Sequence, residues 1–163
     1  MSNFFLDTEF SEDDSGIMFI SIGIVCDNGK EFYRVSKGFE SAQCTDWVKR
    51  NVLTRLNTTD RAHPHEIKKD IINFVTENTL VTPLFWGYYA DYDWFLFCRL
   101  LGGMLKLPTK WPQLCMDLKQ WAIQLKVPVP KQAGLQHNAL ADAKWHAEIH
   151  KFLSAYSKQN RLD

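Results

Sequence analysis

Hydrophobic and polar positions along the chain predict a group of strands near the N-terminus. Apolar residues dominate two stretches, 3–10 and 17–27, and the second is rich in Ile, Val and Phe, as a largely buried strand is. The residues between them, 11–16, are polar and are expected to form a turn. Asp-Asn-Gly at 27–29 favours a tight hairpin turn, and residues 30–36 then alternate as a third strand. We therefore expect the chain to begin with an antiparallel three-strand meander.

The rest of the chain mixes helical and extended patterns. Pro64 suits the first turn of a helix, and Ile67, Ile71, Phe74 and Val75 then form one apolar face. We expect helices at 45–53, from 64 onward, at 89–101, from the capping Asp117 to about 125 and at 138–156, strands at 80–86 and 114–116, and a loop at 127–136. Strands that come first and then alternate with helices predict an α/β domain with a mixed sheet. The 163 residues contain no repeat or linker, so we treat 1–163 as a single domain.

Two acids lie two positions apart in the first predicted strand. Asp7 and Glu9 share a face there, because alternate residues of a strand point the same way. Like charges on one face repel each other unless something neutralises them, and a divalent cation does this well. For this segment alone, an ordinary solvent-exposed pair of acids is the alternative.

Acids also stand at the start of the predicted helix at 89–101. Asp91 and Asp93 follow an apolar strand, and the free N–H groups and dipole of a helix start favour an acid. With two acids present, one can cap the helix while the other has a chemical role.

A histidine and an acid flank the start of the last predicted helix. His137 falls in the preceding loop and Asp142 in the first turns, so both can reach one point. A surface histidine and a first-turn aspartate without chemistry are the alternative for this segment alone. His146 and His150 follow at helical spacing and could form a metal-binding pair, but we expect them on a partly exposed helix face.

In this order, the three segments resemble the DEDD superfamily of 3′–5′ exonucleases, in its histidine-bearing (DEDDh) branch, the group of ribonuclease T and oligoribonuclease. The shared pattern is Asp-x-Glu on the first strand, Asp opening a middle helix, and His-x-x-x-x-Asp opening a late helix. The small bacterial and phage 3′–5′ exoribonuclease-like subfamily is most similar, with Ile-Ser-Ile-Gly at 20–23 and Tyr-Asp at 92–93. The resemblance spans nearly the whole chain. It implies a ribonuclease H-like α/β fold, a central mixed sheet with the three-strand meander, flanked by helices.

The resemblance also implies an activity, the metal-dependent release of 5′-mononucleotides from the 3′ end of single-stranded nucleic acid, RNA in preference to DNA. Two divalent cations, Mg²⁺ or Mn²⁺, would be bound by Asp7, Glu9, Asp93 and Asp142, with Asp7 bridging both. His137 would be the general base for the attacking water, since a near-neutral pKa suits that task. Two alternatives stay open: a ribonuclease H-like protein that binds nucleic acid without cutting it, and an endonuclease.

Either Asp91 or Asp93 could align with the third carboxylate of this family. We select Asp93, because Tyr92-Asp93 matches the subfamily and Asp93 shares a helix face with Phe97 and Leu100, so it can point inward. Asp91 is then expected to cap the helix.

Aromatic residues near these motifs are candidates for stacking on the bases of a single strand. We name Phe10, Tyr89 and Trp86 as candidate substrate contacts, with plain core packing as the alternative for each. Trp47 is expected in the core or in an interface.

Composition limits the mode of binding. Lys+Arg and Asp+Glu both number 19, so the net charge is zero, which argues against coating nucleic acid or an anionic membrane by bulk charge. The sequence has no membrane-length apolar run and no visible secretion signal. Its four cysteines form no Cys-x-x-Cys pair, which predicts reduced thiols in a cytoplasmic protein. The resemblance implies a homodimer, and the many Trp and Phe residues would suit an interface.

Overall fold

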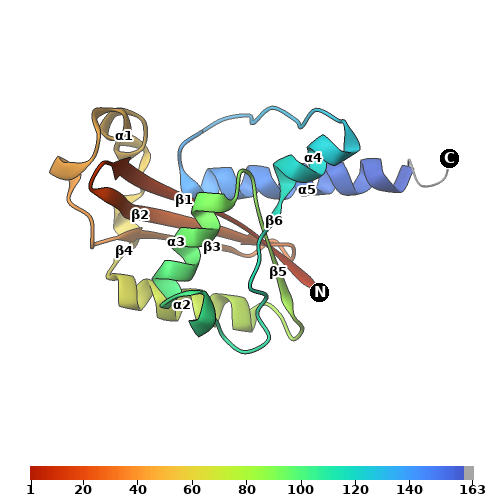
Figure 1. Cartoon of the computed structure of the whole chain (residues 1–163), viewed down its shortest axis with the longest axis horizontal. Helices are drawn as coiled ribbons and strands as arrows, with labels where there is room; N and C mark the ends of the chain where they lie inside the picture. Colours follow the sequence, from red (N-terminus) through yellow and green to blue (C-terminus); the bar gives the residue numbers. More distant parts are fainter. Residues whose placement is uncertain (160–163) are drawn as a thin grey trace.

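The computed structural model describes residues 1–159 and shows a mixed sheet with helices on both faces (Figure 1). The strands are β1 (Ser2–Asp13), β2 (Gly16–Cys26), β3 (Glu31–Ser36), β4 (Arg61–Ala62), β5 (Pro83–Gly87) and β6 (Met116–Asp117). The helices are α1 (Asp46–Asn51), α2 (Pro64–Glu77), α3 (Asp91–Leu101), α4 (Leu118–Leu125) and α5 (Ala139–Gln159), with short 3-10 turns η1 (Ser41–Gln43), η2 (Leu53–Arg55), η3 (Thr58–Asp60) and η4 (Met104–Lys106). None of the helices in this part of the chain is long and apolar enough to cross a membrane.

The sheet has the order β4-β3-β2-β1-β5-β6. β1, β2 and β3 pair antiparallel, which confirms the predicted meander. β5 then joins the other side of β1 in parallel, and β4 and β6 extend the two edges in parallel. β1 therefore lies inside the sheet, paired on both sides near its start.

The first hairpin differs from the prediction, because the expected turn at 11–16 is largely strand. β1 continues through Asp13, and only two residues separate it from β2. The Asp13 carboxylate accepts hydrogen bonds from the Ser15 N–H at 2.8 Å and hydroxyl at 2.5 Å, so polar residues make a short turn here. A register shift between Glu9 and Phe10 marks a bulge, in which Ile20 of β2 is the extra residue because Glu9 pairs with Ser21 and Phe10 with Phe19. Such bulges re-aim side chains, and this one lies directly beside the candidate acids.

Helix termini follow the expected sequence signals in most places. Pro64 is the first residue of α2, and Thr45 caps α1 by accepting from the Val48 N–H at 3.3 Å. Gly102 ends α3 in the left-handed conformation that glycine adopts without strain. The strand predicted at 80–86 starts later, at Pro83, because the Thr79 hydroxyl bonds the backbone of Val81 and forms a turn.

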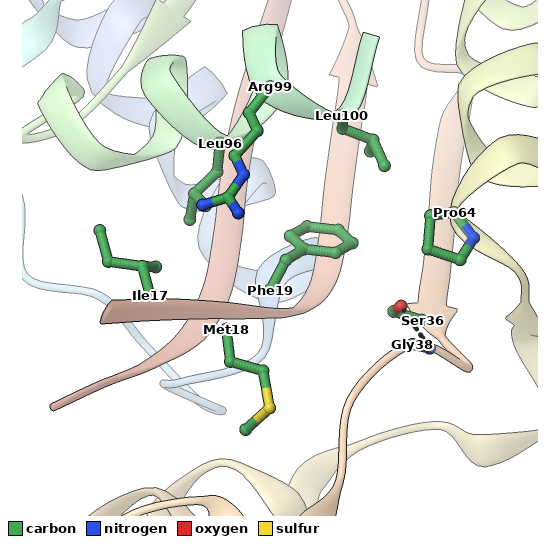
Figure 2. A pocket seen from close by; sticks show the side chains of 9 residues that line it. All are labelled: Ile17, Met18, Phe19, Ser36, Gly38, Pro64, Leu96, Arg99 and Leu100. Atoms are coloured by element: carbon green, nitrogen blue, oxygen red, sulfur yellow. Dashed lines mark hydrogen bonds between the residues drawn. The ribbon is translucent and has the colours of Figure 1, made fainter. Parts of the chain in front are cut away.

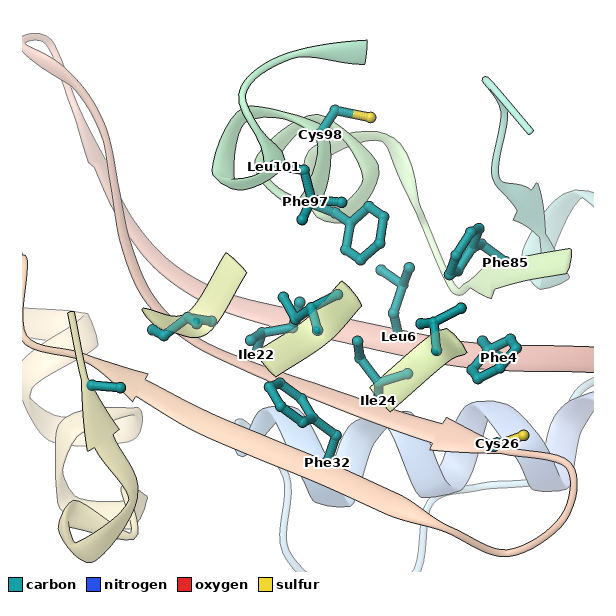
Figure 3. Close-up of a cluster of buried hydrophobic side chains, with 14 residues drawn as sticks. Phe4, Leu6, Ile22, Ile24, Cys26, Phe32, Phe85, Phe97, Cys98 and Leu101 are labelled. Atoms are coloured by element: carbon teal, nitrogen blue, oxygen red, sulfur yellow. The ribbon is translucent and has the colours of Figure 1, made fainter. Parts of the chain in front are cut away.

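The core has three clusters of buried residues, and two of them lie on opposite faces of the sheet. On one face α2 and α3 cover the sheet, and Figure 3 shows Phe97 and Leu101 of α3 above Leu6 and Ile22. The fully buried residues of this cluster include Phe4, Leu6, Ile22, Ile24, Ile67, Ile71, Val75, Phe85, Phe97 and Leu101. On the opposite face α4 and α5 pack against Phe5, Val25 and Trp86, chiefly through Leu118, Ala122, Ala143, Ile149 and Leu153.

The start of α5 approaches the sheet very closely at Gly23 of β2. A Cβ atom placed on Gly23 would lie 2.3 Å from the backbone oxygen of Ala139 and 2.4 Å from the backbone nitrogen of Leu140. Only a residue without a side chain permits this contact. Gly23 is also the β-sheet partner of Asp7, so the contact holds α5 directly beside the first candidate acid.

Replacing Gly23 with Ala should therefore destabilise the fold. The added methyl group must push backbone rather than a flexible side chain, so we expect a loss of about 3 kcal/mol or more in the free energy of unfolding. Denaturant melts of the two proteins measure it. Gly38→Ala is the matched control, because its new Cβ would meet side-chain atoms of Pro64 and Ser36 at 3.1 and 3.2 Å, which can shift. Equal stability of the Gly23→Ala and wild-type proteins would contradict the proposed tight contact.

Candidate active site

Three of the predicted acids converge on one point. Asp7 and Glu9 come from β1 and Asp142 from the first turn of α5, and one carboxylate oxygen of each lies within 4.8 Å of the others. Residues on two distant segments meet here because α5 begins against Gly23, the strand partner of Asp7. The predicted pairing of the first and third segments is therefore present.

Asp142 is held in place by the residues before it. The Gln132 side-chain amide donates to its Oδ1, and the Asn138 backbone N–H donates to Oδ2 at 3.2 Å. Asn138 also caps α5, since its side-chain oxygen accepts from the Ala141 N–H at 3.2 Å. The loop at 127–136 thus holds Asp142 in place through Gln132, a role that sequence analysis missed.

Asp93 is the buried acid of the middle helix. It is 6% exposed, and its Oδ1 accepts from the Thr8 N–H at 2.9 Å and the Thr8 hydroxyl at 2.6 Å. Thr8 lies between Asp7 and Glu9, so these two bonds attach α3 to the acid-bearing segment of β1. Asp91 is exposed, which favours Asp93 as the third carboxylate.

The expected capping role of Asp91 is wrong. Ala90 occupies the N-cap position of α3, and Asp91 is the first helical residue with no cap bond from its side chain. The backbone N–H of Ala90 donates instead to Asp117 at 2.7 Å. Asp117 also accepts from the Gln120 N–H at 2.7 Å, so it caps α4 as predicted and fixes the start of α3 as well.

Burial and mutual repulsion oppose ionisation of the cluster. Desolvation, followed by the charges of Asp93, Glu9 and Asp142, raises the pKa of Asp7 well above its ordinary value. Desolvation, with the neighbouring acids adding to it, raises the pKa of Glu9 to about 8. Burial likewise raises the pKa of Asp93 to about 6, and it raises that of Asp142. Crowded carboxylate oxygens of this kind fit hard divalent cations, which would relieve the repulsion.

His137 lies beside Asp142 on the exposed side of the cluster. Its charge is one of the influences that lower the pKa of Asp142, after the hydrogen bonds from Gln132 and Asn138. Its backbone has a φ of 55°, a conformation that non-glycine residues rarely adopt. Such strain persists only where neighbouring contacts enforce it.

The segment around α1 supplies those contacts to the His137 loop. The Arg55 guanidinium donates to the carbonyl of Gln136 at 2.7 Å, and the Asn138 side chain donates to the carbonyl of Arg55 at 2.9 Å. The Trp47 ring meets the imidazole of His137 edge to face, with centroids 4.9 Å apart. Trp47 is 50% exposed, which excludes the core from the two positions expected for it and leaves an interface as the other; α1 presents the ring to this loop.

His146 is a buried neighbour of the cluster that sequence analysis placed on a partly exposed helix face. It is 2% exposed, its Nδ1 lies 2.9 Å from the Leu6 carbonyl, and its Nε2 lies 3.8 Å from Asp7 Oδ1. Burial lowers its pKa to about 4, so the ring is neutral near pH 7. His150 packs instead against Phe5 and Trp86, with ring centroids 5.1 and 4.6 Å away, so the two histidines have separate surroundings.

The three candidate substrate contacts differ in exposure. Tyr89 is 64% exposed, and Phe10 is partly exposed and stacks on Tyr92 with centroids 5.2 Å apart. Trp86 is 8% exposed and lies in the core against Trp121, so it cannot stack on a base without rearrangement. We therefore retain only Phe10 and Tyr89.

A separate hollow of about 350 Å³ lies between α3 and the first hairpin (Figure 2). Phe19 of β2 and Leu96 of α3 line it with apolar side chains, and Arg99 extends towards it from α3 beside Leu96. No acid lines it, so it is distinct from the candidate active site.

Comparison with known proteins agrees with this geometry. Residues 2–154 match the family model described as the 3′–5′ exoribonuclease Rv2179c-like domain. The chain is 32% identical over 145 residues to the 3′–5′ exoribonuclease Rv2179c of Mycobacterium tuberculosis H37Rv, covering 86% of each chain. The 3′–5′ exoribonuclease MT2234.1 of M. tuberculosis CDC 1551 matches with the same identity and coverage.

Among solved structures, the zinc-bound E. coli ExoI–ssDNA complex shares the fold, with a TM-score of 0.66 at 12% identity. The match covers 99% of this chain but 41% of that chain, so this chain spans less than half of ExoI. The shared fold confirms the predicted ribonuclease H-like α/β architecture. The family model and the M. tuberculosis relatives show that the chain belongs to the Rv2179c-like 3′–5′ exoribonuclease domain family.

Proposed function

We propose that this protein is a metal-dependent 3′–5′ exoribonuclease that removes 5′-mononucleotides from the 3′ end of single-stranded RNA. Residues 1–163 form its single domain in this proposal. The observation that carries it is the convergence of Asp7, Glu9 and Asp142 beside His137, in a chain of an exoribonuclease family.

Two divalent cations, Mg²⁺ or Mn²⁺, are the cofactors in this proposal. Asp7, Glu9 and Asp142 would hold one, and Asp7 with Asp93 would hold the other. When bound, such a pair supplies an activated water at neutral pH and stabilises the leaving oxygen. The donor set supports this assignment, because it consists of carboxylate oxygens whose ionisation is opposed by their crowding.

His137 is the general base of the proposed reaction. It accepts the proton of the attacking water, and its loop position lets it approach the scissile phosphate from the open side. Thr8 keeps Asp93 aligned through its two hydrogen bonds, and Gln132 and Asn138 do the same for Asp142. His146, neutral and buried behind Asp7, keeps that side of the cluster closed to water.

The choice of RNA rests on the family, whose M. tuberculosis members are named exoribonucleases. Phe10 and Tyr89 are the proposed stacking contacts, as expected from the sequence. We also propose that the protein forms a homodimer, as the family resemblance implies. We propose a cytoplasmic location as well, which the buried free thiols of Cys26, Cys44 and Cys98 support.

Digestion of end-labelled strands tests the reaction. Purified protein with Mg²⁺ or Mn²⁺ should release labelled mononucleotides from 3′-labelled single-stranded RNA and progressively shorten 5′-labelled RNA. Matched DNA strands test the preference for RNA. Internal fragments would indicate an endonuclease, and intact strands would indicate a binding protein.

Two variants test the assignment of the acids in the same assay. Asp142→Ala should abolish the metal-dependent release while leaving the far-UV circular dichroism spectrum unchanged. Asp93→Asn should lower kcat by a factor of about 100 or more, the scale of one lost charge-stabilising group, whereas Asp91→Asn should stay within about two-fold because Asp91 is exposed. The opposite ranking of the two Asn variants would reject Asp93 as the third carboxylate.

Without metal, the protein should lose stability as the pH rises. The pKa of Glu9 is about 8 in the folded chain against 4.5 ordinarily, so between these pH values the unfolded chain releases a proton that the folded chain retains. Melts in EDTA should therefore show Tm falling from pH 5 to pH 8. Added Mg²⁺ or Mn²⁺ should raise Tm most at the alkaline end, because ionised carboxylates bind cations.

Glu9→Gln isolates the source of this effect. Because each unit of pKa shift corresponds to about 1.4 kcal/mol, the variant should melt at least ~2–4 °C higher than wild type in EDTA at pH 7.5. It should also lose most of the metal-induced rise. Glu77→Gln, at the exposed end of α2, is the control and should behave as wild type. A lower Tm for Glu9→Gln in EDTA would show that Glu9 is not under repulsion.

Arg55→Lys should slow the reaction without weakening substrate binding. The variant keeps a positive charge near Glu9 but loses the planar group that bonds the Gln136 carbonyl, so the His137 loop is held less firmly. We expect kcat to fall about ten-fold or more, since a hydrogen bond from a charged donor contributes ~1.5–3 kcal/mol, with KM nearly unchanged. Arg50→Lys, on the exposed face of α1, is the matched control. An unchanged kcat would show that the hydrogen bond from Arg55 does not contribute to the function of His137.

A further inference from the structure

A lysine lies over two tyrosine rings close to the acid cluster. The ammonium nitrogen of Lys119 is 6.0 Å from the ring centre of Tyr88 and 5.7 Å from that of Tyr89. The two rings meet edge to face with centroids 4.9 Å apart. Tyr89 is 64% exposed, so one charged group and one open aromatic face are presented together to solvent.

The backbone that builds this cluster is constrained. Tyr89 has a φ of 56°, which is unfavourable for a bulky residue. The next residue, Ala90, donates its N–H to Asp117, and the same carboxylate caps the helix that carries Lys119. Asp117 therefore fixes the β5–α3 turn and the start of α4 relative to each other. A strained conformation held by a dedicated contact is typical of a functional position.

The cluster is joined to the acids by direct packing. The Tyr88 ring lies 6.2 Å from the His146 ring, and Nε2 of His146 lies 3.8 Å from Asp7 Oδ1. Tyr88 also packs edge to face on Trp145, with centroids 4.9 Å apart. These contacts run through the interior, because His146 is buried. At the surface the relation comes from the sheet, since Phe5 of β1 pairs in parallel with Trp86 of β5, so Tyr88 and Tyr89 follow the end of β5 beside Asp7.

Lys119 forms no ion pair with an acid among the residues that the structure describes. Within residues 1–159 the structure shows no carboxylate within 4.0 Å of its nitrogen, in contrast to Lys144, which pairs with Glu31 at 2.9 Å. Tyr88 and Tyr89 also interact with the ammonium through side-chain hydrogen bonds, and they raise the pKa of Lys119. Both partners are uncharged, so the positive charge of Lys119 is not neutralised and can attract an anion. A single strand offers the matching pair of groups, a phosphate for the ammonium and a base for the exposed ring.

We propose that Lys119 and Tyr89, backed by Tyr88, form a second-nucleotide subsite that binds the phosphate and base adjoining the terminal nucleotide. Lys119 contacts the phosphate next to the scissile one, and Tyr89 stacks on the neighbouring base. The inference rests on the proposed function and adds to it a minimum ligand for tight binding, a dinucleotide that carries a 5′-phosphate rather than a single nucleotide.

Direct binding measurements test the subsite separately from cleavage. The probe is a 5′-fluorescein single-stranded RNA heptamer with a phosphorothioate at its terminal linkage, followed by fluorescence anisotropy in Mg²⁺ over a series of salt concentrations. Lys119→Gln is compared with Lys126→Gln, which removes the same charge just beyond the other end of α4. Lys119→Gln should weaken binding at least five-fold and reduce the slope of log K against log salt by about 0.7, the value of one phosphate contact on a single strand. Lys126→Gln should leave both unchanged.

Two tyrosine variants test the ring. Tyr89→Phe keeps the ring and loses only the hydroxyl that interacts with Lys119, so it should bind more tightly than Tyr89→Asn, which should weaken binding about five-fold or more. Asn tolerates the positive φ at this position, so the change does not add backbone strain. Melting temperatures of all four variants report whether each is folded.

Competition by 5′-AMP separates this subsite from the terminal one. A mononucleotide does not reach Lys119, so 5′-AMP should compete equally well against wild type and Lys119→Gln. Equal loss of 5′-AMP and heptamer affinity would overturn the inference, as would an unchanged salt slope. If wild type shortens RNA from the 3′ end while Lys119→Gln binds normally, only the subsite is rejected. If wild type neither binds nor shortens RNA, the proposed function is rejected as well.

Discussion

The candidate site depends on the contact between the backbone of α5 and Gly23 of β2. At this point the backbone of Ala139, at the start of α5, lies so close to the Cα atom of Gly23 that a Cβ atom on Gly23 would clash with it. Asp142 lies less than one turn further along α5, and Asp7 is the direct strand partner of Gly23. One glycine therefore sets the distance between acids that are 135 residues apart in the chain. A larger residue would separate them before any change in the acids themselves.

The close approach of these acids lowers the stability of the folded chain when they are ionised. Four carboxylates lie in a region that excludes much of the water, and burial raises the pKa of each of them. Their hydrogen bonds come chiefly from neutral donors such as Thr8 and Gln132, which orient the oxygens without cancelling their charge. Arg55 is the nearby cation that lowers the pKa of Glu9, and it is also bonded to the His137 loop. The protein thus maintains a group of carboxylates whose ionisation is opposed until a cation offsets their repulsion.

The sequence was sufficient to predict the sheet meander, the family and the convergence of Asp7, Glu9 and Asp142, because these depend on short local patterns. Asp-x-Glu on a strand fixes a shared face, and the spacing of His137 and Asp142 fixes both near one helix start. The contacts that align these groups were not predictable in this way. Trp47 and Arg55 reach His137 from a segment more than 80 residues away, and nothing in their local pattern distinguishes them from other exposed aromatic and basic residues. The burial of His146 depends equally on tertiary packing, since the helical period of α5 alone does not show which face lies against β1.

The zero net charge of the chain is consistent with this arrangement, because its charges are distributed unequally. Acids gather at the candidate site, where bound cations would reverse the local sign, and two basic side chains lie near it. Arg55 stabilises the histidine loop, and Lys119 lies against its two tyrosines. A ligand that reaches both the acids and Lys119 must carry more than one phosphate and present its end to the acids. Duplex-coating proteins achieve affinity through many equivalent phosphate contacts, whereas a few separated cations around a metal-binding centre favour the end of a flexible single strand.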